Sequence, residues 1–271
     1  MRYLLSKVIY NKQISSSYYK IGLLCNELPV LSSPGQFVMV KVSPQADPFL
    51  GRPFSIYSTM KDRQGIEILY KVVGKGTTIL SDKRTADAVH LVGPLGNGFS
   101  IDENCKDIIL VAGGIGIAPF FYLTEWIKER GATLIVGGKV KDDIVCTEEF
   151  QEMNVAVKIV TEDGSLGRRG LVTDMLKEEL REREGYPSVI YACGPIAMLT
   201  EVAAIAKRRD TPCQVSLDRI MACGIGTCLG CVVKTEDKNC KEDIKNKGWT
   251  YKRVCKEGPV FDAREIIWEE R

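Results

Sequence analysis

Three cysteines lie within the stretch MACGIGTCLGC at residues 221–231, and this grouping constrains the chain more than any other feature. The spacing is C-x4-C-x2-C, and a further cysteine follows after 23 intervening residues. Plant-type two-iron clusters use this spacing with a distant fourth cysteine. The intervening glycines let backbone N–H groups approach sulfur closely, as a bridged cluster requires. The predicted ligands of a [2Fe-2S] cluster are Cys223, Cys228, Cys231 and Cys255.

Other interpretations of the cysteines stay open. Four thiolates also suit tetrahedral zinc, although zinc sites usually have two short ligand pairs and only one is present here. Free buried thiols are common for isolated cysteines, but three so close together disfavour them. Cys240 competes with Cys255 as the fourth ligand, and Cys255 is favoured because Cys240 lies in the charged stretch KTEDKNCKEDIKNKGWT. The isolated cysteines are expected to be packing residues: Cys25, Cys105, Cys146 and Cys213.

Composition and charge narrow the class of protein. The 271 residues are 45% hydrophobic, which suffices for two globular domains. A net charge of +2 gives no strong field that would favour nucleic acid or an anionic membrane. The longest apolar run, residues 108–123, contains glycines and a proline and falls short of the roughly 20 residues that span a bilayer. The first residues lack a secretory signal pattern, so the ten cysteines favour a reducing cytoplasm.

The hydrophobic pattern changes along the chain. Residues 1–100 hold short β-branched and aromatic runs separated by turn residues, which predicts an antiparallel barrel. Residues 101–210 begin with DIILVAGGIG and APFFYLTEWIKERG, a buried strand and a helix, and continue in alternation, which predicts a parallel sheet. Residues 211–271 are cysteine-rich and are expected to hold the cluster. The predicted fold class is α+β with these three domains. The only histidine, His90, is expected to be structural, and it excludes a multi-histidine metal site.

Two stretches of the predicted barrel suit a flavin nucleotide. In GRPFSIYS, Arg52 can hold a pyrophosphate and the following strand can lie against a planar ring, although an ordinary strand start has the same pattern. In LYKVVGKGTTILS, Gly74, Gly76 and Thr77 form a turn before a possible short helix. N–H groups and hydroxyls of such a turn can hold phosphate oxygens. The two stretches together favour flavin binding.

Two turns of the predicted parallel sheet suit a nicotinamide nucleotide. LVAGGIGIAPF places Gly113, Gly114 and Gly116 between a strand and a helix, and YACGPIAML repeats the arrangement. Two such turns at the carboxyl ends of strands in one sheet indicate a shared ligand crevice, although tight packing explains each turn alone. The choice between NADH and NADPH stays open. The second turn contains Cys193, Gly194 and Pro195.

The order of these motifs resembles a known superfamily. RPFS, GKGT, GPLGNGF, GGIGIAP and CGP, followed by the four-cysteine ending, are similar to the ferredoxin-NADP reductase superfamily with an appended iron–sulfur segment. Within it, MACGIGTCLGC and YKRVCKEGPVFDA resemble the electron-transfer subunits of NAD-dependent (class 1B) dihydroorotate dehydrogenases. The departure is the long insertion between Cys231 and Cys255.

The resemblance implies a six-stranded FAD barrel, an NAD-binding α/β domain and a C-terminal cluster. It implies a partner, an FMN-containing catalytic subunit that oxidises dihydroorotate in pyrimidine (UMP) biosynthesis, in a heterotetramer with two copies of each chain. Electrons would pass from FMN through the cluster and FAD to NAD. The flavin role falls on Arg52, Pro53, Phe54, Ser55, Leu69, Tyr70, Lys71, Gly76 and Thr77.

No catalytic side chain is predicted in this chain. The proposed sites contain neither a nucleophile with an adjacent base nor an obvious acid–base pair, so the chemistry would belong to cofactors. Two other functions compete with the one that the resemblance implies. One is a related FAD and [2Fe-2S] NAD(P)H reductase module that serves a different redox partner. The other is a zinc-bound regulatory module with a degenerate reductase fold.

Overall fold

The computed structural model describes most of the chain, namely residues 1–60, 62, 64–102, 105, 107–127, 130–237 and 248–268. Cys240, the competing cluster ligand, lies outside the described residues. In the described part of the chain, no helix is both long and apolar enough to cross a membrane.

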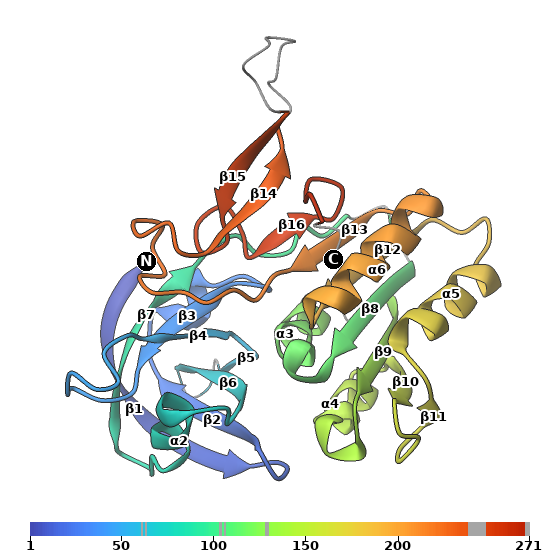
Figure 1. The fold of residues 1–271 in the computed structure, drawn as a ribbon. Helices are drawn as coiled ribbons and strands as arrows, with labels where there is room; N and C mark the ends of the chain where they lie inside the picture. Colours follow the sequence, from blue (N-terminus) through green and yellow to red (C-terminus); the bar gives the residue numbers. More distant parts are fainter. Residues whose placement is uncertain are drawn as a thin grey trace.

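A curled antiparallel sheet forms the N-terminal part of the molecule, on the left of Figure 1. Its strand order is β4-β3-β7-β1-β2-β6-β5. Buried and exposed residues alternate along strands such as β7, because one face of the sheet packs on an apolar interior. The elements are β1 (Arg2–Gln13), β2 (Tyr18–Leu24), α1 (Leu28–Leu31), β3 (Phe37–Lys41), β4 (Arg52–Ser55), β5 (Ser58–Met60), β6 (Gly65–Lys71), α2 (Lys75–Ser81) and β7 (Ala88–Leu95).

The two edges of this sheet are joined by one segment of chain. β4 and β5 are consecutive and are separated only by Ile56 and Tyr57. The N–H of Ile56 donates to the carbonyl of Gln36 at 3.1 Å, and the N–H of Tyr57 donates to the carbonyl of Glu67 at 2.9 Å. The chain therefore passes from one edge of the sheet to the other at this point. The predicted six-stranded barrel corresponds to this arrangement, with its sixth strand divided into β4 and β5.

A second sheet follows, with strand order β11-β10-β9-β8-β12-β13-β16 and only β16 antiparallel to its neighbour. The predicted parallel sheet is confirmed. Its strands are β8 (Asp107–Gly113), β9 (Gly131–Gly138), β10 (Ala156–Thr161), β11 (Arg168–Arg169), β12 (Ser188–Cys193), β13 (Cys213–Ser216) and β16 (Val260–Asp262). Its helices are η2 (Gly114–Ile117), α3 (Ala118–Ile127), η3 (Lys141–Asp143), α4 (Thr147–Glu152), α5 (Val172–Glu182) and α6 (Ile196–Arg208).

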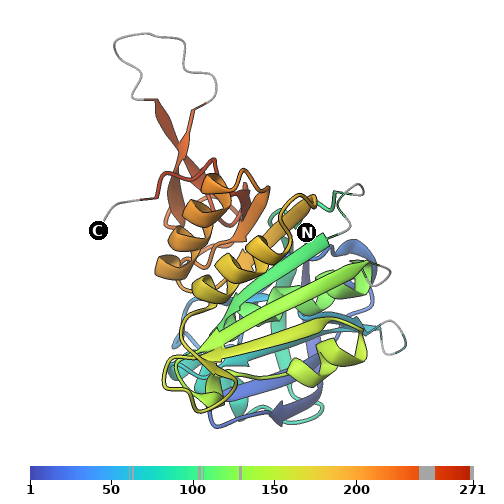
Figure 2. The same cartoon turned by 90° about the vertical axis from the view of Figure 1, so that its right-hand side faces the viewer.

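The central strands of this sheet are apolar runs because both of their faces are covered. Ile109 and Val111 of β8 pack in one core with residues of α5 and α6. The alternate residues Ile108 and Leu110 pack in a second core with α3, and this core also includes Leu69 of the barrel. Figure 2 shows α5 and α6 on the face of the sheet that is turned away from the barrel. The barrel and the parallel sheet therefore share a core on the side of α3.

A two-stranded hairpin projects from the molecule beside these two sheets (Figures 1 and 2). It consists of β14 (Val232–Glu236) and β15 (Trp249–Arg253), paired antiparallel. The cysteine loop, residues 223–231, precedes it, and Cys255 follows it. The segment after residue 210 also contributes β13 and β16 to this sheet, where β13 pairs with β12 and β16 pairs with β13.

Candidate redox site

Backbone N–H groups are directed at the sulfurs of the cysteine loop. The N–H of Cys228 donates to the Sγ of Cys223 at 3.4 Å, and the N–H of Gly230 donates to the Sγ of Cys228 at 3.5 Å. From the other side of the hairpin, the N–H of Cys255 donates to the Sγ of Cys231 at 3.4 Å. Such bonds stabilise thiolate sulfur and are part of the environment that tunes a metal cluster.

The thiol pKa values indicate that the cysteine side chains share one site. Burial opposes ionisation of Cys223, but backbone N–H groups, with that of Cys228 foremost, lower its pKa to about 6. Burial, the neighbouring Cys231 thiol and the charge at Cys223 together raise the pKa of Cys255 to about 12. Cys255 therefore interacts with Cys231 and Cys223, while Cys223 interacts with Cys228. The four predicted ligands therefore lie in one part of the structure, but among the described residues no three of them are arranged as a group that could hold a metal ion.

The cysteine loop packs against the barrel at Gly224. Gly224 has a φ of +70°, and a Cβ on it would overlap the side chain of Met39, with the sulfur at 2.9 Å. Met39 lies on β3, where it pairs with Pro53 of β4. The loop is therefore separated from the predicted flavin strand by one residue.

Arg253 fastens the loop to the segment that carries Cys255. Its Nη1 donates to the carbonyl of Gly226 in the loop at 2.9 Å. Its Nε donates to Oε2 of Glu257 at 3.0 Å, and the two side chains form an ion pair. Sequence reasoning did not single out Arg253. The signal was the pair Arg253 and Glu257, four residues apart on either side of Cys255, in RVCKE.

One edge of the cysteine loop faces solvent. Cys228 is exposed, whereas Cys231 and Cys255 are buried. Beside Cys228, Leu229 is 60% exposed, and Ile220 at the start of the loop segment is 92% exposed. A hollow of about 530 Å³ adjoins this edge, lined by Leu229, Val232, Tyr251, Lys252, Arg253 and Glu257.

In the barrel, the structure brings Arg52 and the turn before α2 together. The guanidinium of Arg52 lies on the backbone of Gly76, where a Cβ would be 2.7 Å from the Cζ of Arg52. Arg52 also donates to the carbonyl of Leu50. The hydroxyl of Thr77 is used within the turn, since it accepts from the N–H of Gly74 at 3.1 Å. A cation and the N-terminal end of a helix thus meet at one point.

The other predicted flavin residues have different environments. The rings of Phe54 and Tyr70 meet edge to face with centroids 5.7 Å apart. Ser55 is half-buried beside them on β4. Leu69 is buried in the core shared with the parallel sheet. The ammonium of Lys71 is 2.8 Å from the carboxylate of Asp143, so Lys71 links the barrel to the parallel sheet.

The two predicted nicotinamide turns lie against each other. β8 and β12 are neighbours in the parallel sheet, so their carboxyl ends lie side by side. A Cβ on Gly116 would overlap the carbonyl of Cys193. A Cβ on Gly113 would be 2.7 Å from the ring of Pro195, and one on Gly194 would be 2.9 Å from the nitrogen of Gly113. All six predicted residues therefore form one small surface, with Gly114 also beside the Tyr18 hydroxyl of the barrel.

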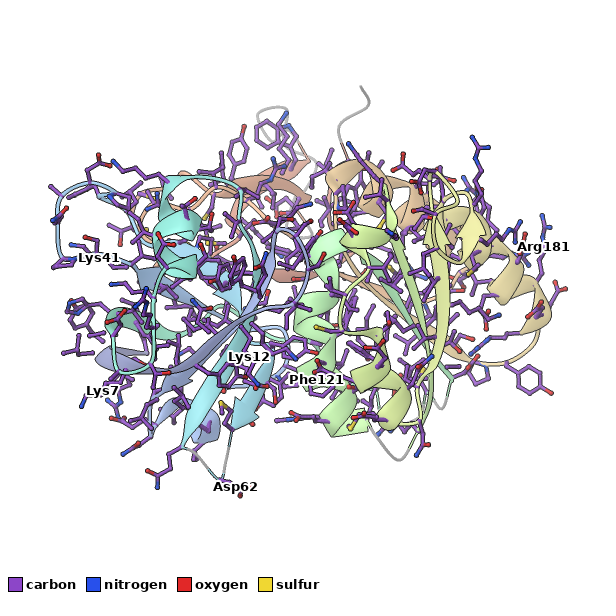
Figure 3. The ribbon with its side chains drawn as sticks, turned by 90° about the horizontal axis from the view of Figure 1, so that it is seen from below. Lys7, Lys12, Lys41, Asp62, Phe121 and Arg181 are labelled. Carbon is purple, nitrogen blue, oxygen red and sulfur yellow. The ribbon has the colours of Figure 1, made fainter. Side chains whose placement is uncertain are left out.

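The junction between barrel and parallel sheet is aromatic and polar. Tyr57 stacks on Phe121 with centroids 4.8 Å apart, and Figure 3 labels Phe121 between the two parts of the molecule. The hydroxyl of Tyr57 donates to Glu149 at 2.7 Å, and Lys20 forms an ion pair with the same carboxylate. Burial raises the pKa of Tyr18 at this junction to about 12, so it stays a neutral hydroxyl. Sequence reasoning missed these residues because no local motif marks them.

Two family models match parts of this chain, and known relatives match almost all of it. Residues 218–267 match the family model "Iron-sulfur cluster binding domain of dihydroorotate dehydrogenase B", and residues 110–204 match "Oxidoreductase NAD-binding domain". The dihydroorotate dehydrogenase B (NAD(+)) electron transfer subunit of Caldanaerobacter subterraneus subsp. tengcongensis is 38% identical over 263 residues, covering 97% of this chain and 98% of that protein. The subunit of the same name from Desulforamulus reducens is 35% identical over 266 residues, covering 97% of this chain and 98% of that protein.

This chain belongs to the dihydroorotate dehydrogenase B electron transfer subunits. The predicted resemblance is confirmed. A solved NADH-dependent reduced ferredoxin-NADP oxidoreductase, studied for flavin-based electron bifurcation, is also similar, with a TM-score of 0.83 and 29% identity over 98% of this chain and 90% of that one. A ferredoxin NADP+ reductase from Neisseria gonorrhoeae with bound FAD and NADP shares the fold, with a TM-score of 0.66 and 17% identity over 77% of this chain and 92% of that one. The predicted fold class is confirmed.

The residues present fit the cofactors of a dihydroorotate dehydrogenase B electron transfer subunit, which are a [2Fe-2S] cluster, FAD and NAD. For the cluster, three N–H groups are directed at sulfur and a glycine stands where any side chain would strike the barrel. For FAD, the guanidinium of Arg52 and the start of α2 offer donors to phosphate oxygens. For NAD, the glycine turns after β8 and β12 lie side by side at the carboxyl ends of the strands, where nucleotides bind in such sheets.

Proposed function

We propose that this chain carries electrons from an FMN-containing catalytic subunit, which oxidises dihydroorotate, to NAD+. The observation that carries the proposal is that N–H groups link Cys228 to the sulfur of Cys223 and Cys255 to the sulfur of Cys231, in a loop region that is solvent-exposed at Cys228 and packs through Met39 on the strand beside Arg52 and Pro53. A one-electron carrier and a flavin would then have neighbouring sites. When bound, FAD exchanges a hydride with nicotinamide and single electrons with the cluster.

The residues of the chain would divide the work of holding these groups. Cys223, Cys228, Cys231 and Cys255 would ligate the cluster. Arg52 would bind the flavin phosphates, and Phe54 and Tyr70 would bound the space for its ring system. The backbone turns with Gly113, Gly114, Gly116, Cys193, Gly194 and Pro195 would bind NAD. Pro53, Ser55, Leu69, Lys71, Gly76 and Thr77 complete the proposed flavin site. The proposed division into domains is 1–100, 101–210 and 211–271.

The exposed edge at Cys228 is the proposed docking face for the catalytic subunit. Leu229 beside it is apolar and exposed, and the adjoining hollow can take a side chain of the partner. Docking there would bring the FMN of the partner toward the cluster. We propose a heterotetramer of two copies of each chain, and a cytoplasmic location, which the free thiols of the described cysteines fit. Mass measurement of the complex and fractionation of cells test these two points.

A second candidate function is a reductase module in an enzyme with another redox partner. The likeness to the NADH-dependent reduced ferredoxin-NADP oxidoreductase supports it, because that likeness extends over 98% of this chain. Both functions need the same three cofactors. They differ only in the protein that docks on the cluster edge.

The deciding experiment mixes the purified holoprotein with a dihydroorotate dehydrogenase catalytic subunit. NADH formation that needs dihydroorotate and both chains is the expected result. A chain that contains iron and FAD and is reduced by NADH, yet forms no NADH with the catalytic subunit, would transfer the assignment to the second candidate. Purified protein that contains zinc, but neither iron nor acid-labile sulfide, would show that the chain holds no [2Fe-2S] cluster.

A further inference from the structure

The segment Lys141 to Glu152, which we call the arm, ties the parallel sheet to the barrel. It follows the carboxyl end of β9 and includes η3 and α4. Its carbonyl at Asp142 accepts a hydrogen bond from Ser15 at 3.0 Å. The carboxylates of Asp143 and Glu149 form ion pairs with the barrel.

The carboxylate of Asp143 accepts three hydrogen bonds, two of them from the barrel. Its Oδ1 accepts from the ammonium of Lys71 at 2.8 Å and from the hydroxyl of Tyr18 at 2.8 Å. Its Oδ2 accepts from the N–H of Lys139 at 3.1 Å. One carboxylate therefore joins strands β2 and β6 of the barrel to the end of β9.

Both ion pairs of the junction have the same polarity. The barrel supplies the cations, Lys20 and Lys71, and the arm supplies the anions, Asp143 and Glu149. Asp143 stays ionised because hydrogen bonds from Lys71 and Tyr18 outweigh the burial that opposes ionisation, so its pKa is lowered. The pair with Asp143 raises the pKa of Lys71 despite burial. Both groups are charged at neutral pH, and the contact is ionic.

The contacts of Asp143 lead directly to the proposed NAD turns. The hydroxyl of Tyr18 lies 3.6 Å from the position of a Cβ on Gly114, so the barrel touches the glycine turn there. At the other end, the N–H of Lys141 donates to the hydroxyl of Ser165 at 2.7 Å, which joins the arm to the loop after β10. Asp143 thus lies between the turn after β8 and the loops after β9 and β10. These are the strand ends at which nucleotides bind in such sheets.

We propose that Asp143 is a positioning residue, which binds Lys71 and holds Tyr18 of the barrel against the glycine turn and so sets the geometry in which NAD meets the flavin. This inference rests on the proposed function. Asp143 itself touches neither the proposed cluster nor the reacting atoms. It acts through Tyr18 and Lys71, and its loss leaves both side chains without their shared acceptor.

The chain offers matched control variants. Asp142→Asn makes the same chemical change one residue away, where the side chain is exposed and the contact with Ser15 uses the main-chain carbonyl, which the variant retains. Glu149→Gln weakens the other ion pair of the arm, which lies at Tyr57 and away from Gly114. The second variant therefore distinguishes positioning of Tyr18 at the glycine turn from a general contribution of ion pairs that hold the barrel and the parallel sheet together.

The experiment compares holoproteins carrying Asp143→Asn, Asp142→Asn and Glu149→Gln with the wild type. Hydrogen exchange reports the protection of residues 18–20 and 141–145, and stopped-flow absorbance reports flavin reduction over a range of NADH concentrations. For Asp143→Asn we expect faster exchange in both segments and a limiting rate lowered about tenfold, since small displacements of reacting groups cost rates of this order or more. NADH affinity, FAD content and the cluster spectrum should change less than about twofold. Asp142→Asn should match the wild type, and Glu149→Gln should keep a limiting rate within about twofold of it.

Each outcome decides one question. Equal losses of limiting rate in Asp143→Asn and Glu149→Gln would overturn the inference, because they would show general cohesion of the junction. An unchanged exchange pattern and rate in Asp143→Asn would also overturn it. A wild-type protein that takes up FAD but is not reduced by NADH would instead overturn the proposed function, and the exchange measurement would still report whether Asp143 holds the barrel.

Discussion

The cysteine loop and the proposed NAD site between barrel and parallel sheet, which we call the crevice, both depend on glycine turns, but they are assembled over very different distances in the chain. Three of the four cysteines and two of the N–H donors to sulfur lie between residues 223 and 231. In the crevice, Tyr18 and Asp143 are bonded to each other although they are 125 residues apart in sequence. The first site follows from one local segment, whereas the second exists only when barrel and parallel sheet dock.

The largest expected effect is loss of the iron–sulfur cluster from the cysteine loop. Cys228→Ser removes the exposed ligand, and we expect complete loss of the cluster, because three thiolates leave one iron with only one of its two protein thiolates. Iron analysis and an EPR spectrum of the reduced protein measure the loss. NADH should still reduce FAD in this variant, because the crevice does not use the loop.

Two further cysteine variants test the fourth ligand. Cys255→Ser should abolish the cluster as Cys228→Ser does, since Cys255 contacts Cys231 in the structure. Cys240→Ser should retain the iron of the wild type. Iron lost from Cys240→Ser and kept in Cys255→Ser would mean that the other cysteine is the ligand.

The difference in sequence distance between the two sites explains which of their features could be predicted from the sequence. The spacing of Cys223, Cys228 and Cys231 identified the loop, because ligands that come from one turn are close together in the sequence. The strand-to-helix turns at Gly113 and Cys193 were likewise visible as short motifs. These two turns touch because β8 lies beside β12, and the sequence predicted both turns at strand ends of one sheet.

The next largest effect is a loss of stability and of NADH affinity at the crevice. Gly116→Ala places a Cβ on the carbonyl of Cys193, and backbone on both sides must shift. We expect the free energy of unfolding to fall by about 1–3 kcal/mol, as for other overpacked sites. NADH affinity should fall about tenfold because the two turns separate, while the iron content stays unchanged. Thermal unfolding and NADH titration measure the two effects.

A second glycine supplies the control for that variant. A Cβ on Gly131, at the start of β9, meets nothing within 4 Å. Gly131→Ala should therefore bind NADH like the wild type. Similar losses of NADH affinity in both variants would show that the contact between the turns is not what holds the nucleotide.

A smaller effect concerns the link between the loop and the chain after the hairpin. Arg253→Met removes the hydrogen bond to Gly226 and the ion pair with Glu257. A hydrogen bond to a charged group contributes about 1.5–3 kcal/mol, so we expect the cluster to form but to be lost several-fold faster to a chelator. Lys252→Met is the control, because Lys252 pairs with Glu265 and does not bond the loop. Equal rates of iron loss in the two variants would contradict the role of Arg253.

The residues that sequence reasoning missed share a physical cause. Met39, Asp143 and Tyr18 are ordinary members of strands or turns, and each matters only through a partner from another part of the fold. Their contacts depend on how the barrel docks with the parallel sheet and with the cysteine loop, which hydrophobic periodicity does not describe. Lys71 illustrates the point, since the resemblance assigns it to the flavin and the structure pairs it with Asp143.

The smallest expected effect is a pH dependence of stability that arises at Asp143. Burial opposes ionisation of Asp143, but Lys71 and Tyr18 outweigh it and lower its pKa in the folded protein. A lowered pKa stabilises the fold above the ordinary carboxyl pKa of about 3.9, and this contribution is lost as the pH falls through the folded value. Asp143→Asn should therefore lower the free energy of unfolding by at most about 1 kcal/mol at pH 7, and the difference from the wild type should vanish in acid.

Urea unfolding of the wild type and Asp143→Asn at neutral pH, at about pH 5 and below the ordinary carboxyl pKa measures this difference. Asp142→Asn, with its exposed side chain, is again the control and should show no such trend. A difference that stayed constant into acid would mean that Asp143 stabilises the junction by shape or neutral hydrogen bonds. The docking of the two sheets would then not depend on charge, and the contrast with the cysteine loop would rest on sequence distance alone.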